Sequence, residues 1–234
     1  MSVDDSFTKS LLHFDGVDAS TTFTDESGKI WTTGGTAQLD TAQSKFGMAS
    51  GLFAGSINYI TTPDHADFNV GANNFTVDFW FKKTAGTGSY LTGFGICDST
   101  TVGTNSSMNF LVDATKTGVV QIQVFIGTNT NFVNGTTLIT DTNWHHVAAV
   151  RNTTTLALYQ DGVLQGTSNV AAGTINNSSR MPTIGRLGDY TAGYYMHGWI
   201  DEFRFSNGTA RWTSNFTPPT SAYGISNPPR IMIF

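Results

Sequence analysis

One segment, Phe75–Lys82, constrains the fold most, because its apolar and polar residues alternate strictly. Its odd-numbered positions are three Phe and one Val, whereas its even-numbered positions are Thr, Asp, Trp and Lys. In an extended chain these two sets point to opposite sides. The segment therefore predicts a β-strand whose apolar side is packed against a second layer.

Similar segments recur about every ten to fifteen residues, separated by clusters of Gly, Asn and Thr, a spacing typical of β-sandwiches and barrels. No stretch keeps a helical period for three turns, and residues 209–215 form at most a single helical turn. Asp161-Gly162 predicts a tight hairpin. The other expected strands are Leu11–Phe14, Asn58–Thr61, Val119–Ile126, Trp144–Arg151, Leu156–Gln160, Val163–Leu164, Arg180–Leu187 and Trp199–Phe205.

The composition also favours an all-β chain. Charged residues make up 12% of the 234 residues, about half the usual fraction, and threonine alone outnumbers them. Threonine suits the exposed side of a strand, and glycine and asparagine suit tight turns. A net charge of −5 with no concentrated basic surface argues against nucleic acid as a partner.

The sequence also bears on the cell compartment. No run reaches the roughly 18 apolar residues of a membrane span, and the start of the chain lacks the basic and apolar regions of a secretory signal. The single cysteine, Cys97, excludes an internal disulfide. We expect a protein made in a cytoplasm, with no membrane partner.

Several motifs together resemble laminin-G-like, concanavalin-A-like lectin domains. In that family a Trp-His strand is followed by a strand that ends in Asp-Gly. The motifs lie in the family's order and are Leu11–Gly16, Asp25–Gly28, Phe75–Phe81, Asn143–Arg151, Leu156–Gly162, Ile184–Arg186 and Gly198–Phe205. The resemblance implies an antiparallel jelly-roll β-sandwich over residues 11–217, with an N-terminal arm at 1–10 and a Pro-rich apolar tail at 218–234.

Relatives of this fold include glycosidases, but the sequence argues against catalysis. Those enzymes place paired carboxylates on one strand in a Glu-x-Asp-x-Glu pattern, and the only two glutamates here, Glu26 and Glu202, are far apart. His145 and His146 are neighbours on an expected strand, so their rings point to opposite sides and cannot form one ligand pair. We predict a protein without enzyme activity and with no required cofactor.

The resemblance also implies a structural calcium ion, which such domains often hold near the rim of the sandwich. Calcium takes about six to eight oxygen ligands. The candidates are Asp15 and Asp201, on N-terminal and C-terminal segments expected to lie side by side. The alternative is that Asp15 belongs to a turn and that Asp201 is a hydrogen-bonding residue at a strand end.

A segment that contains several glycines and lies before the last strand is the candidate carbohydrate site. It contains Asp189, Tyr190, Tyr194, Tyr195 and His197, and a sugar needs an aromatic platform with polar neighbours. Exposed tyrosine also serves as an anchor of protein interfaces. The alternative is that Tyr194 or Tyr195 fills the end of the sandwich.

The C-terminal part suggests a role in an assembly. Residues 210–219 are similar to the ending of such domains in structural proteins of tailed phages. The chain closes on Ile231, Met232, Ile233 and Phe234, whose burial would stabilise a contact by about 1.5–3 kcal/mol each. These four residues either complete the chain's own sheet or dock on a partner.

We therefore expect a non-enzymatic structural protein on the surface of a tailed-phage virion, a capsid decoration or tail-associated subunit that could present a glycan-binding face. Its partners would be other virion proteins, copies of itself and a cell-surface glycan. The alternative function is a free carbohydrate-binding module or bacterial adhesin, and a glycoside hydrolase is the least supported class.

Overall fold

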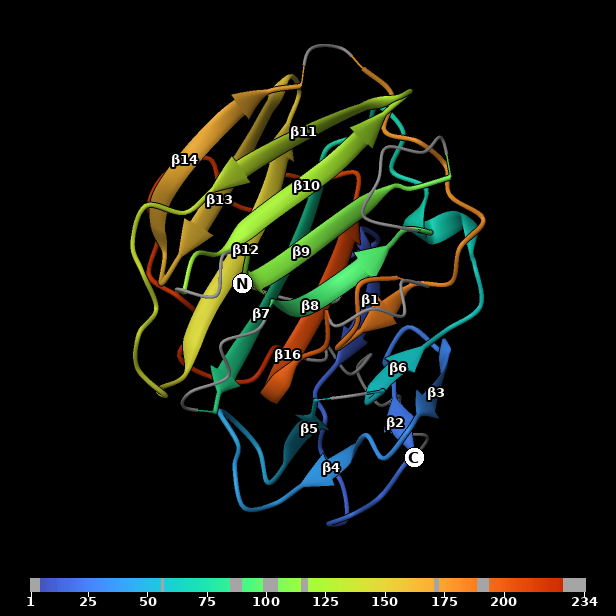
Figure 1. The fold of residues 1–234 in the computed structure, drawn as a ribbon, viewed down its shortest axis with the longest axis vertical. Helices are drawn as coiled ribbons and strands as arrows, with labels where there is room; N and C mark the ends of the chain where they lie inside the picture. The colour runs from blue at the N-terminus through green and yellow to red at the C-terminus, as the bar shows by residue number, and fades with distance from the viewer. Residues whose placement is uncertain are drawn as a thin grey trace, which may run out of the picture.

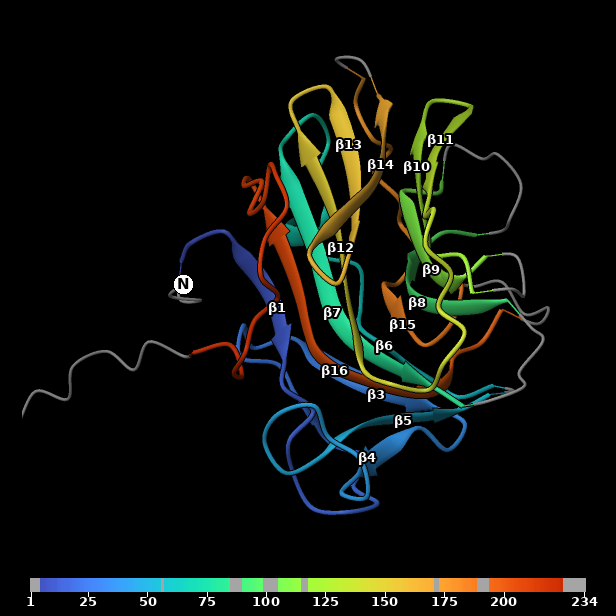
Figure 2. The ribbon, with the colours of Figure 1, turned by 90° about the vertical axis from the view of Figure 1, so that its left-hand side faces the viewer.

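The structure is a computed structural model that describes residues 5–55, 57–84, 90–98, 105–114, 118–170, 173–188 and 194–224. Its strands form two antiparallel sheets that pack face to face (Figures 1 and 2). This arrangement confirms the all-β, antiparallel jelly-roll sandwich expected from the sequence. The described residues contain one short 3-10 helix, η1 (Ala66–Phe68), and no helix among them is long and apolar enough to cross a bilayer.

We name each sheet after a central strand. The β7 sheet runs in the order β14 (Val163–Asn169), β13 (Thr155–Gln160), β12 (His145–Asn152), β7 (Phe75–Lys83), β16 (His197–Asn207), β5 (Ser50–Ala54) and β4 (Gln38–Asp40), with β1 (Thr8–Leu12) also paired to β16. The β8 sheet runs in the order β11 (Asn129–Asn134), β10 (Gln121–Ile126), β9 (Met108–Asp113), β8 (Leu91–Ile96), β15 (Thr183–Ile184), β6 (Tyr59–Thr61), β3 (Ile30–Gly34) and β2 (Phe23–Thr24).

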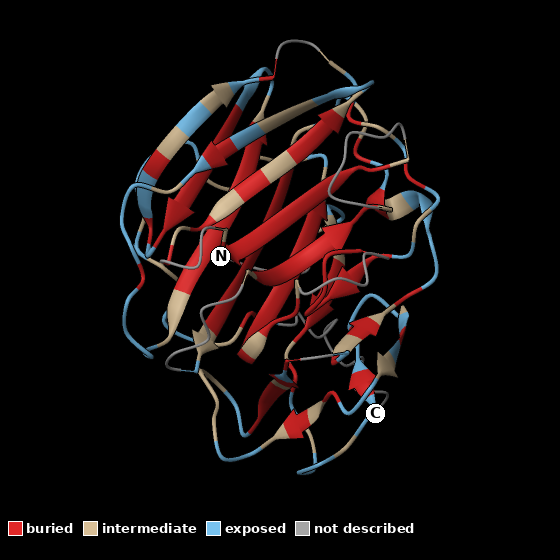
Figure 3. Cartoon of the chain, viewed as in Figure 1, coloured by how far each residue is buried: buried red, intermediate tan, exposed pale blue. Residues whose placement is uncertain are grey.

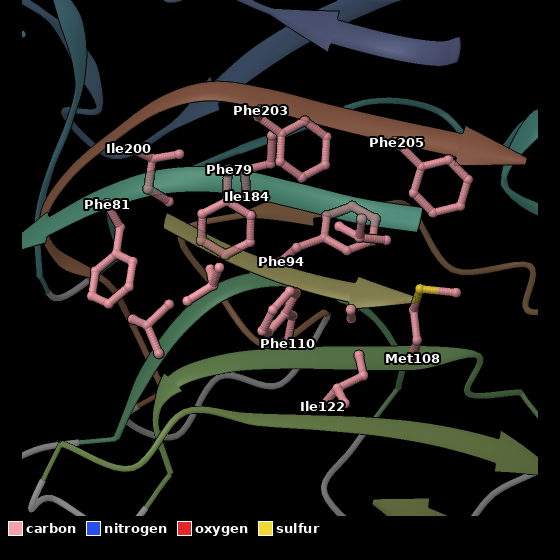
Figure 4. Packing of buried hydrophobic residues seen from close by; sticks show 14 of the residues in the cluster. Phe79, Phe81, Phe94, Met108, Phe110, Ile122, Ile184, Ile200, Phe203 and Phe205 are labelled. Atoms are coloured by element: carbon pink, nitrogen blue, oxygen red, sulfur yellow. The ribbon is translucent and has the colours of Figure 1, made fainter. Parts of the chain in front are cut away.

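The core lies between the two sheets and is rich in phenylalanine (Figure 4). The Phe and Val side chains of β7 point into it, as the alternation predicts. Phe79 packs edge-on against Phe110 of the opposite sheet, with ring centroids 5.1 Å apart. Phe94 of β8 and Phe203 of β16 lie at the same centroid distance. These contacts place the central strands in the most buried part of the molecule (Figure 3).

A third layer covers the outer side of the β7 sheet. After β16 the chain turns back across this side (Figure 2), where Trp212 and Phe216 stack with centroids 4.1 Å apart. Both rings pack against a buried cluster that includes Ala148, Val150 and Tyr159. The segment 209–215 has no helical turn in the structure. Residues 218–224 continue this layer, and one of them, Tyr223, has a buried side chain.

Candidate functional site

The predicted carbohydrate residues are only partly brought together. Asp189 and Tyr190 lie outside the described residues. Tyr194 is half-buried and stacks on Tyr90, which directly precedes β8, with ring centroids 4.7 Å apart and an interplanar angle of 16°. Tyr194 also packs against a small cluster on the outer side of the β8 sheet that includes Leu111. The pair therefore forms an aromatic platform at a partly exposed position.

Tyr195 and His197 take different positions. Tyr195 is 9% exposed and forms an isolated β-bridge with Arg186. The His197 ring lies directly against Gly55. A Cβ atom at position 55 would come within 2.1 Å of the Cε1 atom of His197, so only glycine fits there. Burial lowers the pKa of His197, which favours the neutral imidazole. Neither side chain adds to the Tyr90–Tyr194 platform.

Tyr90 is a platform residue that the sequence analysis missed. It lies directly before Leu91–Ile96, a segment that the sequence analysis did not predict as a strand. The pairing of β8 with β9 (Leu91 opposite Asp113) fixes the start of β8 beside the end of β9. Tyr194 in turn packs against a cluster that includes Leu111 of β9, so long-range contacts bring Tyr90 to Tyr194.

The two predicted metal residues brace one loop. Asp15 Oδ1 accepts hydrogen bonds from the backbone N–H groups of Met48 and Ala49, at 2.7 and 3.2 Å. Asp201 Oδ2 accepts from the N–H groups of Lys45 and Phe46, at 2.7 and 3.1 Å. Burial raises the pKa of Asp201 to about 7, against these donors, which favour its charged form.

A calcium cage needs oxygen ligands, and N–H donors turned toward a carboxylate compete with a cation. Within the part of the chain that the structure describes, no group of three or more His, Cys, Asp or Glu side chains could hold a metal ion. In the structure Asp15 and Asp201 accept hydrogen bonds from backbone N–H groups. A structural calcium at these residues stays a prediction. The predicted partner-contact residues Ile231, Met232, Ile233 and Phe234 lie outside the described residues.

A buried ionic network on the outer side of the β7 sheet was not expected. Asp78 of β7 accepts hydrogen bonds from Nε and Nη2 of Arg204 on β16, at 2.9 and 3.0 Å. The Tyr223 hydroxyl donates to the same carboxylate, and His146 Nε2 lies 3.5 Å from it. Burial alone would raise the pKa of Asp78, but Arg204 and His146 outweigh it and lower the pKa to about 2. The network joins the C-terminal segment to the sheet.

The two histidines of β12 point to opposite sides, as predicted. His146 faces the third layer and packs edge-on against Trp212 and Phe216, with both centroid distances 5.7 Å. His145 lies on the other side, with Nε2 2.8 Å from Asp141 and Nδ1 2.8 Å from Asp161. The two rings share no ligand position, so they do not form a metal pair.

The contacts of His145 make stability depend on pH. Its burial opposes protonation, but hydrogen bonds to Asp161 and Asp141 favour the imidazolium and raise its pKa above 6.5. This contribution is therefore fully present below pH 6.5 and is lost as pH rises through the raised pKa. We expect His145→Gln to lose more stability at pH 6 than at pH 9, as measured by urea unfolding. The free energy of unfolding of the variant is compared with that of the wild type at each pH, so that contributions from other titrating groups cancel. Equal losses at the two pH values would contradict this prediction.

The two glutamates differ in their surroundings. Glu202 Oε1 lies 2.8 Å from His13 Nδ1, and its Oε2 accepts the backbone N–H of Tyr223 at 2.7 Å. Glu26 is exposed and lies in the turn that follows Asp25. Glu202 therefore anchors the C-terminal segment.

Comparison with known proteins gives a consistent picture of the fold. Residues 54–213 match the family model described as the Concanavalin A-like lectin/glucanases superfamily. No curated protein sequence matches the chain.

Among solved structures, the binding domain of Paraclostridial Mosquitocidal Protein 1 superimposes with a TM-score of 0.64 at 15% identity, covering 87% of this chain and 49% of that one. Domain 4 of AbnA, a GH43 extracellular arabinanase from Geobacillus stearothermophilus in complex with arabinotriose, gives 0.62 at 18%, covering 87% and 94%. The binding domain of Botulinum Neurotoxin DC in complex with SialylT gives 0.57 at 19%, covering 86% and 48%. The chain thus spans about half the length of the toxin domains.

Proposed function

Because residues 54–213 place the chain in the concanavalin A-like lectin/glucanase superfamily, to which it belongs, we propose that it is a non-catalytic carbohydrate-binding domain. The observation that carries this proposal is the stacked pair of Tyr90 and Tyr194 at a partly exposed position on the β8 sheet. An aromatic ring offers the apolar face of a sugar a flat surface. Two of the similar structures are described as complexes with arabinotriose and with SialylT.

A binding role also agrees with the positions of the acidic side chains. A retaining glycosidase needs two carboxyl groups about 5–5.5 Å apart that flank a substrate. Here Glu202 holds the C-terminal segment and Asp201 holds a loop, so both serve the fold. The similar toxin structures are described as binding domains, which supports the same conclusion.

Tyr194→Ala is the direct test of the proposal. We expect it to weaken glycan binding at least tenfold, equal to about 1.4 kcal/mol, because it removes one ring of the stacked pair. Tyr194→Phe is the matched control, since it keeps the ring and should keep most of the affinity. A glycan array followed by titration calorimetry measures both variants. Binding that is unchanged in Tyr194→Ala, or a protein that binds no glycan, would overturn the proposal.

We also propose that this domain serves as a surface subunit of a tailed-phage virion. Support comes from residues 210–219, which resemble the ending of phage domains, and from a surface with few charges to keep copies apart. In the structure the same segment includes Trp212, which packs on the outer side of the β7 sheet. A free carbohydrate-binding module or adhesin is the rival, in which the sandwich acts alone.

Deletion of Asn227–Phe234 separates these two roles. We expect the shortened chain to stay folded and to lose assembly, because the deletion removes the apolar Ile231–Phe234 sequence proposed to contact partners. Light scattering after size-exclusion chromatography reports assembly, and circular dichroism reports folding. A shortened chain that assembles as fully as the complete one would contradict the virion role and leave the rival in place.

A further inference from the structure

A row of four side-chain amides crosses the outer side of the β8 sheet. Asn109 Nδ2 donates to Gln123 Oε1 at 3.3 Å, and Gln123 Nε2 donates to Gln121 Oε1 at 2.5 Å. Gln121 Nε2 then donates to Asn134 Oδ1 at 2.5 Å. The register explains the row, because Gln123 lies opposite Asn109 on β9, and Gln121 lies opposite Asn134 on β11. Directly opposed residues share one side of a sheet.

All three hydrogen bonds run in the same direction, so the row has an acceptor end and a donor end. At the acceptor end Asn109 is fully buried, and its Oδ1 atom has no hydrogen-bond partner in the described structure. The Ser107 hydroxyl, two residues before it, is also buried without a partner. Each such group costs about 1–3 kcal/mol unless a water or a ligand satisfies it. One end of the row therefore has an unsatisfied acceptor, Asn109 Oδ1.

The other end of the row is accessible. Gln121 and Gln123 are half-buried, and Asn134 is exposed. Phe132 lies opposite Gln123 in the same register and is 53% exposed. Its strand, β11, is exposed at three of its six positions, Asn129, Phe132 and Asn134 (Figure 3). An exposed aromatic ring and the amides of Gln121, Gln123 and Asn134 thus lie side by side at the surface.

This surface is uncharged. Residues 118–140, which include both β10 and β11, contain no Asp, Glu, Lys, Arg or His. Each amide offers a donor and an acceptor together, a combination that matches neighbouring hydroxyl groups of a sugar. The ring of Phe132 offers the apolar counterpart. These two strands contain no cationic side chain that could pair with the carboxylate of an acidic sugar.

We propose that the outer side of β10 and β11 binds a neutral oligosaccharide, with Phe132 under one sugar ring and with Gln121, Gln123 and Asn134 bonded to its hydroxyl groups. This inference rests on the proposed carbohydrate-binding function and names its ligand class. Leu111 links the two regions, since it lies opposite Gln121 and belongs to the cluster against which Tyr194 packs. Leu111 itself is buried, so the row and the Tyr90–Tyr194 platform lie on either side of a covered position on β9.

The test uses the full chain and titration calorimetry with four neutral probes, namely arabinotriose, xylotriose, cellotriose and maltotriose, and with 3′-sialyllactose as the acidic probe. Phe132→Ala and Gln123→Leu are each expected to raise the dissociation constant for the neutral probe at least tenfold. Ile30→Ala is the matched control, because Ile30 is an apolar residue on β3 of the same sheet and is 75% exposed. This variant should bind the probe as the wild type does. Thermal unfolding checks that all three variants are folded.

The outcomes separate the two proposals. Binding of a neutral probe that is weakened by Phe132→Ala and Gln123→Leu supports the inference. Binding that depends on Tyr194 but not on Phe132 or Gln123 overturns the inference and leaves the proposed function standing, as does binding of the sialylated probe alone. A chain that binds none of the probes and no glycan on an array overturns both.

Discussion

Asp78→Ala is expected to lower the free energy of unfolding by about 3–5 kcal/mol, because it leaves the Arg204 guanidinium buried without its counter-ion. Arg204 is 2% exposed and Asp78 is 0% exposed, so water cannot replace the lost partner. Tyr223 and His146 also lose the carboxylate that they contact. For a chain of this length, a loss of this size lowers the melting temperature by roughly 6–20 °C.

A surface ion pair is the matched control for this prediction. The Arg180 guanidinium lies 3.9 Å from Asp98, and the Arg180 side chain is 41% exposed, so Arg180→Ala should cost about 0–1 kcal/mol. The double variant Asp78→Leu/Arg204→Met removes both buried charges and should recover much of the loss, since an apolar pair can replace a buried ion pair. Urea unfolding compares the variants. Losses of equal size in Asp78→Ala and Arg180→Ala would contradict the assignment of a buried network.

The inner side of the sandwich could be predicted from the sequence, but the outer side of the β7 sheet could not. The alternation of residues 75–82 shows which side chains share a side of a strand, and the Phe side does form the core. It does not show whether a third layer covers the polar side. Asp78 and Thr76 are on that side and are fully buried beneath the C-terminal segment. Trp80 on the same side is a signal that could have indicated a covered surface.

Some expected strands were misjudged because glycines interrupt them. The segment 180–187 was expected to be one strand, but only Thr183–Ile184 pairs as β15. Gly185 follows with a φ of 87°, a left-handed conformation that ends the extended chain. Its neighbour Arg186 then pairs with Tyr195 only as an isolated bridge. A local pattern of apolar residues cannot reveal such a turn.

The candidate site could be predicted only in part, for a related reason. The alternation of residues 119–126 places Gln121 and Gln123 together on the polar side of a strand, and this much follows from the sequence. Their partners Asn109 and Asn134 come from other strands and are found only through the register. In the same way Tyr194 was identified from the sequence, whereas its stacking partner Tyr90, far from it in the chain, was found only in the structure. Sites that several strands build together depend on contacts that no local pattern encodes.

Tyr223→Ala is expected to cost about 3–5 kcal/mol, the range for removing a buried large aromatic side chain. The Tyr223 side chain is 7% exposed, and the Arg204 guanidinium lies 3.9 Å from its ring centroid. Burial and the neighbouring Asp78 raise the pKa of Tyr223 well above 10, so its hydroxyl remains a donor at neutral pH. Urea unfolding and calorimetry measure the loss.

Two comparisons show which part of the contact matters. Tyr223→Phe keeps the ring and removes only the hydroxyl, so it should cost about 1–3 kcal/mol, because Asp78 loses one donor. A chain that ends after Gly224 keeps the whole contact, whereas a chain that ends after Phe216 also loses the bond from Tyr223 N–H to Glu202. Equal stability of these two shortened chains would contradict the prediction. If the longer chain is the more stable, residues 217–224 belong to the folding unit of the sandwich, and any tail that contacts partners begins after them.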